Sequence, residues 1–277
     1  MRIQLEKKKT PFALAFVALI GQGLFLQAQE QTDTQEQKIM IPAGSFADQG
    51  AFDQHWNYLY AWGEDHNGSA RMKQEQVKIE NSELHITADR LTTPEGRSTK
   101  DPHLPIVYHS GAIHSKALVK VDDTYPMWEL SGSFKAPIQK GTWPAFWITG
   151  SETWPPESDI LEFKGDNINW QNTVKGKDWR NTDWQTEKTE VATADKTWHR
   201  YTLIMRKIDE KDVELQYYID DELKASHTAD FVGKPFHVIV NLQMEGASGP
   251  LRSGPEQAVF KAKDIEVKAY KNIKQKD

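Results

Sequence analysis

Short runs of alternating apolar and polar residues, separated by turn residues, recur along most of the chain. Val77 and Ile79, then Leu84 and Ile86 after a polar turn, predict a β-hairpin over residues 77–89. Similar strand patterns follow at residues 114–121, 127–137, 141–150, 157–163, 199–208, 213–227, 235–246 and 263–273, the 213–227 segment turning about Asp220-Asp221. No stretch of twelve or more residues keeps a clear helical period. Many short strands without an internal repeat predict an all-β fold, a β-sandwich or jelly roll.

The first residues follow the pattern of an export signal. Arg2 and Lys7–Lys9 precede an apolar run at residues 11–26, and Ala28 offers a cleavage site. This predicts a signal peptide over residues 1–28 and a secreted or periplasmic location, with an uncleaved anchor as the alternative. The segment has no cysteine, so the sequence does not predict a lipoprotein anchor.

The rest of the chain divides into a short leader and one domain. Residues 29–38 are polar and rich in glutamine, which predicts a disordered leader. Residues 39–274 contain no segment with the composition of a linker, so we expect a single domain there. Because the chain has no cysteine, its stability must come from the core rather than from disulfides.

Charge argues against two classes of partner. The whole chain carries a formal charge of −6, and residues 1–28 contribute a net +3, so the mature protein is at about −9. A protein this acidic is not expected to bind nucleic acid or anionic membranes broadly. A local arginine or histidine could still hold a single anionic group.

Tryptophan is the informative part of the composition. The chain has ten, and eight of them fall between Trp62 and Trp184. A core uses tryptophan sparingly because the indole N–H needs a partner. Exposed indoles that stack on sugar rings are one interpretation, and ordinary core packing is the other.

Three carboxylates fall within six residues of one predicted strand, at Glu157, Asp159 and Glu162. Side chains alternate between the two faces of a regular strand. Glu162 follows Glu157 by five residues, an odd number, so in a regular strand it would face away from Glu157 and Asp159. A β-bulge between Asp159 and Glu162 would bring all three to one face. The Cα atoms of Glu157 and Glu162 would then lie ~13 Å apart.

Two glutamates at that spacing can do acid/base chemistry. Their carboxyls could approach ~5–5.5 Å, the separation in a retaining glycosidase, whereas an inverting pair needs ~6.5–9.5 Å. Neighbouring carboxylates cannot all ionise freely, so their pKa values move apart. A solvated polar strand and a Ca²⁺ site are the alternatives for the triplet alone.

The surrounding motifs carry a resemblance to a known family. "SGAIHSK" (110–116), "WELSGSFKAP" (128–137), "GTWPAFW" (141–147) and "WPPESDILEF" (154–163) occur in this order. Together with "NWQNT", "YYIDDEL" and "FHVIVNLQMEG", they resemble glycoside hydrolase family 16, the β-jelly-roll endo-glycanases. The resemblance implies two curved antiparallel sheets with an open substrate cleft.

It also implies roles for the three carboxylates. Glu157 would be the nucleophile, Asp159 its hydrogen-bonding partner, and Glu162 the acid/base. Ser158 stands where the family usually has an aliphatic residue, which puts the packing behind the strand in doubt.

The same resemblance suggests substrate contacts. Trp143 and Trp147, four apart on one strand, would lie near the sugar beside the nucleophile, with core packing as the alternative. Further candidates are Trp154, His114, Asn172 and Glu245, where a buried histidine and a rim salt bridge are alternatives for His114 and Glu245.

Two segments are expected to be loops that set specificity, residues 60–72 and 174–185. They add Trp62, Arg71 and Arg180 as substrate-binding candidates. Aromatic residues beside cations suit a polysaccharide with anionic groups, since arginine binds sulfate or carboxylate well. Solvated loop charges are the alternative.

The expected function is that of a secreted, retaining endo-glycanase. The resemblance is greatest to the branch acting on red-algal galactans, and the loop cations favour porphyran, followed by agarose and then laminarin or another β-1,3-glucan. A non-catalytic carbohydrate-binding module is the alternative from another class. We expect a monomer that needs no cofactor and no catalytic metal; a structural Ca²⁺ near Asp264 is suggested by relatives.

Overall fold

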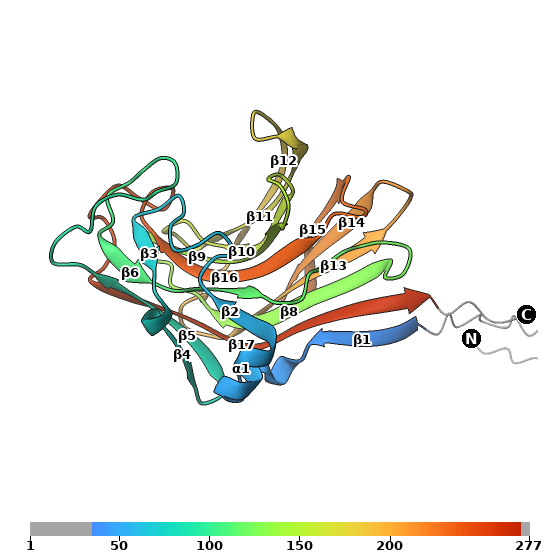
Figure 1. Cartoon of the computed structure of the whole chain (residues 1–277), viewed down its shortest axis with the longest axis horizontal. Helices are drawn as coiled ribbons and strands as arrows, with labels where there is room; N and C mark the ends of the chain where they lie inside the picture. Colours follow the sequence, from blue (N-terminus) through green and yellow to red (C-terminus); the bar gives the residue numbers. More distant parts are fainter. Residues whose placement is uncertain (1–34, 273–277) are drawn as a thin grey trace, which may run out of the picture. The chain divides into compact units, whose positions relative to one another are not determined.

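The computed structural model describes residues 35–272, whose strands form two packed sheets (Figure 1). The expected signal peptide and residues 29–34 of the expected leader lie outside this range. The leader prediction is wrong for residues 35–38, because the first strand, β1, already begins at Gln35 and pairs with the last strand. Within residues 35–272 we find no helix with the length and apolar character needed to cross a membrane.

The larger sheet has ten strands, and its main path runs in the order β15-β14-β13-β8-β17-β5-β6-β3. Strand β1 also pairs with β17, and β4 also pairs with β5. The strands are β1 (Gln35–Ile41), β3 (Ala70–Met72), β4 (Val77–Glu80), β5 (Glu83–Arg90), β6 (Tyr108–Ser110), β8 (Met127–Lys135), β13 (His199–Lys207), β14 (Val213–Ile219), β15 (Glu222–Ala229) and β17 (Gln257–Asn272). The pairing is antiparallel except between β3 and β6, which run parallel.

The smaller sheet has seven strands in the order β12-β11-β10-β9-β16-β7-β2, all paired antiparallel. The strands are β2 (Trp56–Tyr58), β7 (Ala112–Ser115), β9 (Thr142–Gly150), β10 (Glu157–Glu162), β11 (Ile168–Asp178), β12 (Asn181–Glu190) and β16 (Phe236–Met244). Helical structure in the described residues is limited to α1 (Gln49–His55) and two single turns, η1 (Ala43–Phe46) and η2 (Gln74–Gln76). The all-β sandwich expected from the sequence is confirmed.

Side chains that face the core alternate along β9 with side chains that face away from it. Phe146 and Ile148 are fully buried between the layers, while Trp143 and Trp147 point to the opposite face. Phe146 meets Phe134 of β8 with 4.9 Å between ring centroids, so these two rings join the sheets directly. The apolar face therefore forms the core, and the other face is left for the site.

Two segments differ from the sequence-based prediction. The strand expected over 114–121 ends at Ser115. Residues 174–185, expected to be a loop, belong to a long hairpin formed by β11 and β12, which Figure 1 shows rising from one end of the smaller sheet. The predicted hairpins at 77–89 and at Asp220-Asp221 are confirmed, and both aspartates have positive φ angles.

The hairpin also connects the two sheets at their edges. The side-chain amide of Gln185 on β12 donates to the carbonyl of Thr228 on β15 (2.7 Å) and accepts from its N–H (3.2 Å). A single side chain thus satisfies both backbone groups of one residue on the edge of the larger sheet.

Behind the acidic strand lies a buried polar network instead of purely apolar packing. The Ser158 hydroxyl lies 2.7 Å from the Tyr217 hydroxyl, which in turn lies 2.5 Å from Thr173 Oγ1. Thr173 contacts His227 Nδ1 at 2.9 Å, and Tyr217 also donates to the backbone carbonyl of Asn172 at 3.1 Å. Ser158, the departure from the family pattern, is therefore matched by a tyrosine from the facing sheet.

We predict that Tyr217→Phe lowers the free energy of unfolding by about 1–3 kcal/mol, because it leaves buried hydroxyl groups without a partner. Urea denaturation would measure this loss. Tyr218→Phe is the control, since the Tyr218 hydroxyl contacts only the neighbouring Gln216 side chain at a partly buried site. A loss no larger than that of the control would contradict the stabilising role of the network.

Candidate active site

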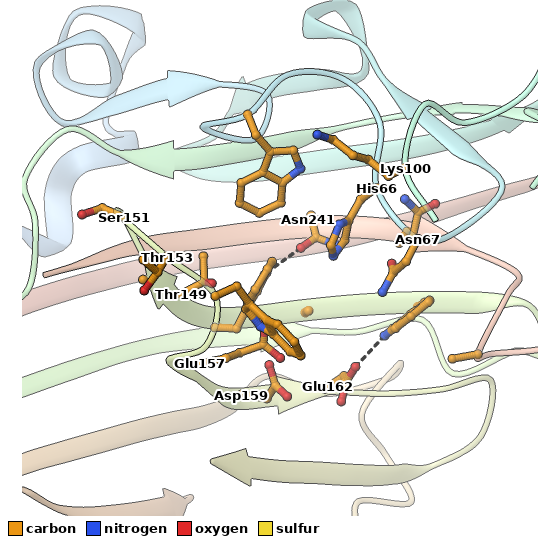
Figure 2. Close-up of a pocket in the computed structure, with 18 of the residues that line it drawn as sticks. His66, Asn67, Lys100, Thr149, Ser151, Thr153, Glu157, Asp159, Glu162 and Asn241 are labelled. Carbon is orange, nitrogen blue, oxygen red and sulfur yellow. Dashed lines mark hydrogen bonds between the residues drawn. The ribbon is translucent and has the colours of Figure 1, made fainter. Parts of the chain in front are cut away.

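The acidic strand contains the bulge that its spacing predicts. Asp159 pairs with Trp147, and Leu161 pairs with Phe146, so Ile160 is an extra residue in β10. Ile160 and Leu161 are both buried, and Glu162 returns to the face that carries Glu157 and Asp159. Figure 2 shows the three carboxylates together on the cavity side of this strand. The bulge therefore brings Glu162 to the same face as Glu157 despite their odd spacing, as the sequence predicts.

These carboxylates line a cavity of about 690 Å³ in the concave face of the smaller sheet. Its other lining residues are Trp62, His66, Asn67, Lys100, Trp143, Ala145, Trp147, Thr149, Gly150, Ser151, Glu152, Thr153, Trp154, Lys164, Trp184, Asn241, Gln243 and Ala247. The cavity combines aromatic rings with a small number of polar groups, as sites for sugars and other small ligands do.

Each carboxylate is held by N–H donors from neighbouring segments. Trp154 Nε1 donates to Glu157 Oε2 (2.9 Å), and Trp143 Nε1 donates to Glu162 Oε1 (2.7 Å). Asn172 Nδ2 bridges Asp159 Oδ2 (2.8 Å) and Glu162 Oε2 (2.9 Å). These bonds orient all three groups.

Burial shifts the ionisation of the nucleophile candidate and its neighbour. It raises the pKa of Glu157 to about 7, with the charge of Glu162 adding to the increase and the Trp154 hydrogen bond opposing it. Burial also raises the pKa of Asp159 well above its usual value, and the charges of Glu162 and Glu157 act in the same direction. The three groups therefore share fewer than three negative charges at neutral pH.

Four predicted aromatic contacts lie in the cavity. Trp147 is 5% exposed, and its Nε1 donates to Asn241 Oδ1 (2.7 Å), so it belongs to both the core and the cavity wall. Trp62 meets Trp147 edge to face with 6.1 Å between centroids. Trp143 and Trp154 also line the cavity while they bond the carboxylates.

Four other predicted contacts are placed elsewhere. Arg71 forms a bidentate pair with buried Asp65 (2.8 and 3.1 Å). Glu245 is fully buried and faces Arg90. His114 contacts Leu59 O and Asn57, and Arg180 lies at the hairpin turn with its guanidinium 4.7 Å from the Trp179 ring centroid. None of the four lines the cavity in the described structure.

Asn172 has a different position from the one expected. It is 2% exposed and lies beneath the carboxylates, where its amide is used by Asp159 and Glu162 and its Oδ1 accepts from Thr186. The structure therefore gives it a role in holding the acids in place, rather than a surface for substrate.

His66, from the segment 60–72 that was expected to set specificity, also lies in the cavity. It stacks on Trp147 with 5.9 Å between centroids, and burial lowers its pKa to about 4, so its ring is neutral. Two other cavity residues, Gln243 and Lys164, were not predicted from the sequence. Gln243 follows Asn241 by two positions, and this period-two spacing was the available signal for it. Lys164 follows Glu162 by the same spacing, but beyond the end of the strand.

The predicted Ca²⁺ has little support from side chains. Asp264 is exposed at a bulge of β17, with a φ of 53°. Across residues 35–272 no three His, Cys, Asp or Glu side chains are grouped so that they could share an ion. The described side chains do not form a Ca²⁺ cage there, and the ion stays a prediction.

Comparison with known proteins places this geometry in a family. The family model "Glycosyl hydrolases family 16" matches residues 64–248, which include the whole acidic strand. The chain belongs to glycosyl hydrolase family 16. A galactan endo-β-1,3-galactanase from Flammulina velutipes is 39% identical over 233 residues, which are 82% of this chain and 89% of that protein. An endo-1,3-1,4-β-glycanase, EglC, from Rhizobium meliloti is 32% identical over 136 residues, 47% of this chain and 27% of that protein.

Two solved structures share the fold of this chain at low sequence identity. Porphyranase B from Zobellia galactanivorans is 16% identical with a TM-score of 0.63, covering 87% of this chain and 95% of its own. The laminarinase catalytic domain from Thermotoga maritima MSB8 is 20% identical with a TM-score of 0.62, covering 86% and 98%. Such identities support the fold and leave specificity open.

We predict that Glu157→Gln stabilises the protein above pH 7. A carboxyl with a raised pKa contributes stability that is fully present below about pH 4.5 and lost as the pH rises through about 7. Glutamine avoids that loss and keeps an oxygen for Trp154, so the gain at pH 8 should be about 1–2 kcal/mol.

Urea unfolding of wild type and variant at pH 4 and pH 8 would test this, with Glu152→Gln as the control because Glu152 is an exposed cavity residue. Equal or lower stability of Glu157→Gln at pH 8 would show that Glu157 ionises without cost.

Proposed function

We propose that this protein is an exported, endo-acting β-galactan hydrolase that works by double displacement. The observation that carries the proposal is the bulged strand, which brings two glutamates and an aspartate to one cavity wall among aromatic side chains. The export signal predicted from the sequence at residues 1–28 supports action outside the cytoplasm.

The chemistry follows from the positions of the acids. Glu157 attacks the anomeric carbon while Glu162 gives its proton to the leaving glycosidic oxygen. Glu162 then takes a proton from water, which displaces Glu157 and restores both groups with retention of configuration. Asp159, held by Asn172, lies on the same cavity wall between the two glutamates, and Trp154 orients Glu157.

A β-1,3-linked galactan is the substrate that we place first. The support is the relative named as an endo-β-1,3-galactanase, which matches this chain over most of both lengths. Porphyran comes second, because Lys100 and Lys164 bring cations into the cavity. The arginines from which sulfate binding was expected, Arg71 and Arg180, lie outside it.

Release of reducing ends from β-1,3-galactan, porphyran, agarose and laminarin would test the proposal. We expect release from β-1,3-galactan, and Glu157→Ala and Glu162→Ala should each lower it by at least about a thousandfold, as loss of an essential catalytic group does. NMR of the first product should show the β-anomer. Unchanged activity in Glu157→Ala would end the mechanism, and no release from any polymer would favour a binding module.

One end of the cavity offers an aromatic surface for a sugar. Trp154 and Trp184 are 40% and 49% exposed, and their ring centroids lie 6.5 Å apart. We predict that Trp184→Ala raises KM about five- to tenfold with little change in kcat, the equivalent of about 1–1.4 kcal/mol of binding.

Trp179→Ala is the matched control, because Trp179 is 66% exposed near the tip of the same hairpin and does not line the cavity. Steady-state kinetics on the cleaved polymer would measure both variants. An equal effect of the two substitutions would contradict a specific stacking role for Trp184.

A further inference from the structure

Lys164 lies beside the acid/base candidate Glu162. It follows the end of β10 by two residues, and its Nζ lies 3.0 Å from Glu162 Oε2. Its side chain is 22% exposed and lines the cavity. The ammonium also lies 4.6 Å from the centroid of the Trp170 ring and 5.9 Å from that of Trp143, so two indoles border it.

Glu162 accepts two hydrogen bonds and forms one ion pair in this arrangement. Trp143 donates to Oε1 and Asn172 donates to Oε2, while the Lys164 ammonium is paired with Oε2. A positive charge at this distance favours the ionised carboxylate over the neutral acid.

The other groups around Glu162 act against Lys164 or are neutral. Asp159 and Glu157 of the same strand repel a negative charge on Glu162. The neighbouring strands β9, β11 and β16 present uncharged side chains to this part of the cavity, namely Trp143, Asn172 and Gln243. Across the cavity lie Lys100, which is exposed, and His66, which is neutral.

The ion pair between Lys164 and Glu162 disfavours the protonated acid that the first step needs, but it favours release of the proton during that step. Glu162 must carry a proton before the first step, and the ammonium disfavours that form. When the proton moves to the glycosidic oxygen, however, Glu162 becomes a carboxylate, and the ammonium stabilises the charge that develops. A stronger acid transfers its proton more readily but holds it over a narrower pH range.

We propose that Lys164 is a positioning residue that acts through Glu162, stabilising its carboxylate and setting the alkaline limit of activity. The inference rests on the proposed function, since it takes Glu162 as the acid/base. Lys164 contacts this group and need not touch the substrate.

The test is the pH dependence of kcat and kcat/KM on the polymer that the wild type hydrolyses, measured between pH 4 and 10. The alkaline limb is the part of the pH profile in which activity falls as the pH rises. In Lys164→Met this fall should occur about one pH unit or more higher than in the wild type, because the charge that favours the Glu162 carboxylate is gone. The maximal kcat should fall at the same time, because Glu162 becomes a weaker acid. Lys164→Arg should keep the limb near its wild-type position, since it keeps the charge.

Lys188→Met is the matched control. The Lys188 ammonium lies 3.7 Å from the centroid of the same Trp170 ring, on β12, and forms no ion pair with Glu162. Its removal takes a cation from Trp170 and should leave the alkaline limb unchanged. Lys164→Gln carries the same test if Lys164→Met does not fold.

Glu162→Gln separates failure of this inference from failure of the proposed function. Loss of activity in Glu162→Gln together with an unmoved limb in Lys164→Met would overturn the role of Lys164 alone. Equal shifts in Lys164→Met and Lys188→Met would also overturn it. Retained activity in Glu162→Gln would overturn the role of Glu162, and this inference with it.

Discussion

The desolvation of three neighbouring carboxylates is the constraint on which the cavity depends. A carboxylate that leaves water needs hydrogen-bond donors or an opposite charge, and here the partners are indole and amide donors and one ammonium group. They come from β9, from β11 and from the segments on either side of β10, at Trp143, Asn172, Trp154 and Lys164. The site therefore exists only while three strands keep their register.

The bulge in β10 makes this arrangement compatible with a packed core. Without the extra residue at Ile160, either Glu162 or the apolar residues before it would face the wrong layer. With it, Ile160 and Leu161 stay buried and Glu162 returns to the cavity. One extra residue thus allows the same six-residue strand to bury its apolar side chains and to present all three carboxylates to the cavity.

The sequence was most informative where a local rule applied. Strand alternation predicted the sandwich, and the odd spacing of Glu157 and Glu162 predicted the bulge. The sequence was least informative where a residue's contact partner is distant in the chain, or where the neighbouring residues give no signal of its environment. Nothing near Glu245 indicates that it is buried against Arg90, which comes more than a hundred residues earlier.

The hairpin of β11 and β12 was missed for a different reason. Strand β12 is exposed or only partly buried at every position, so it lacks the apolar alternation that marks a strand. Its pairing with β11 and the side chain of Gln185 hold it in place instead. Local patterns cannot report contacts of that kind.

The contact between Gln185 and Thr228 has a consequence for the protein in solution. An edge strand with free N–H and C=O groups is a template on which another chain can pair. Gln185 occupies both groups of Thr228 on β15, and β12 itself carries Asp183, Glu187, Lys188 and Glu190. The Gln185 amide thus covers part of the β15 edge, and the charged side chains of β12 disfavour pairing with another chain at the edge of the smaller sheet. This end of the sandwich therefore resists edge-to-edge aggregation.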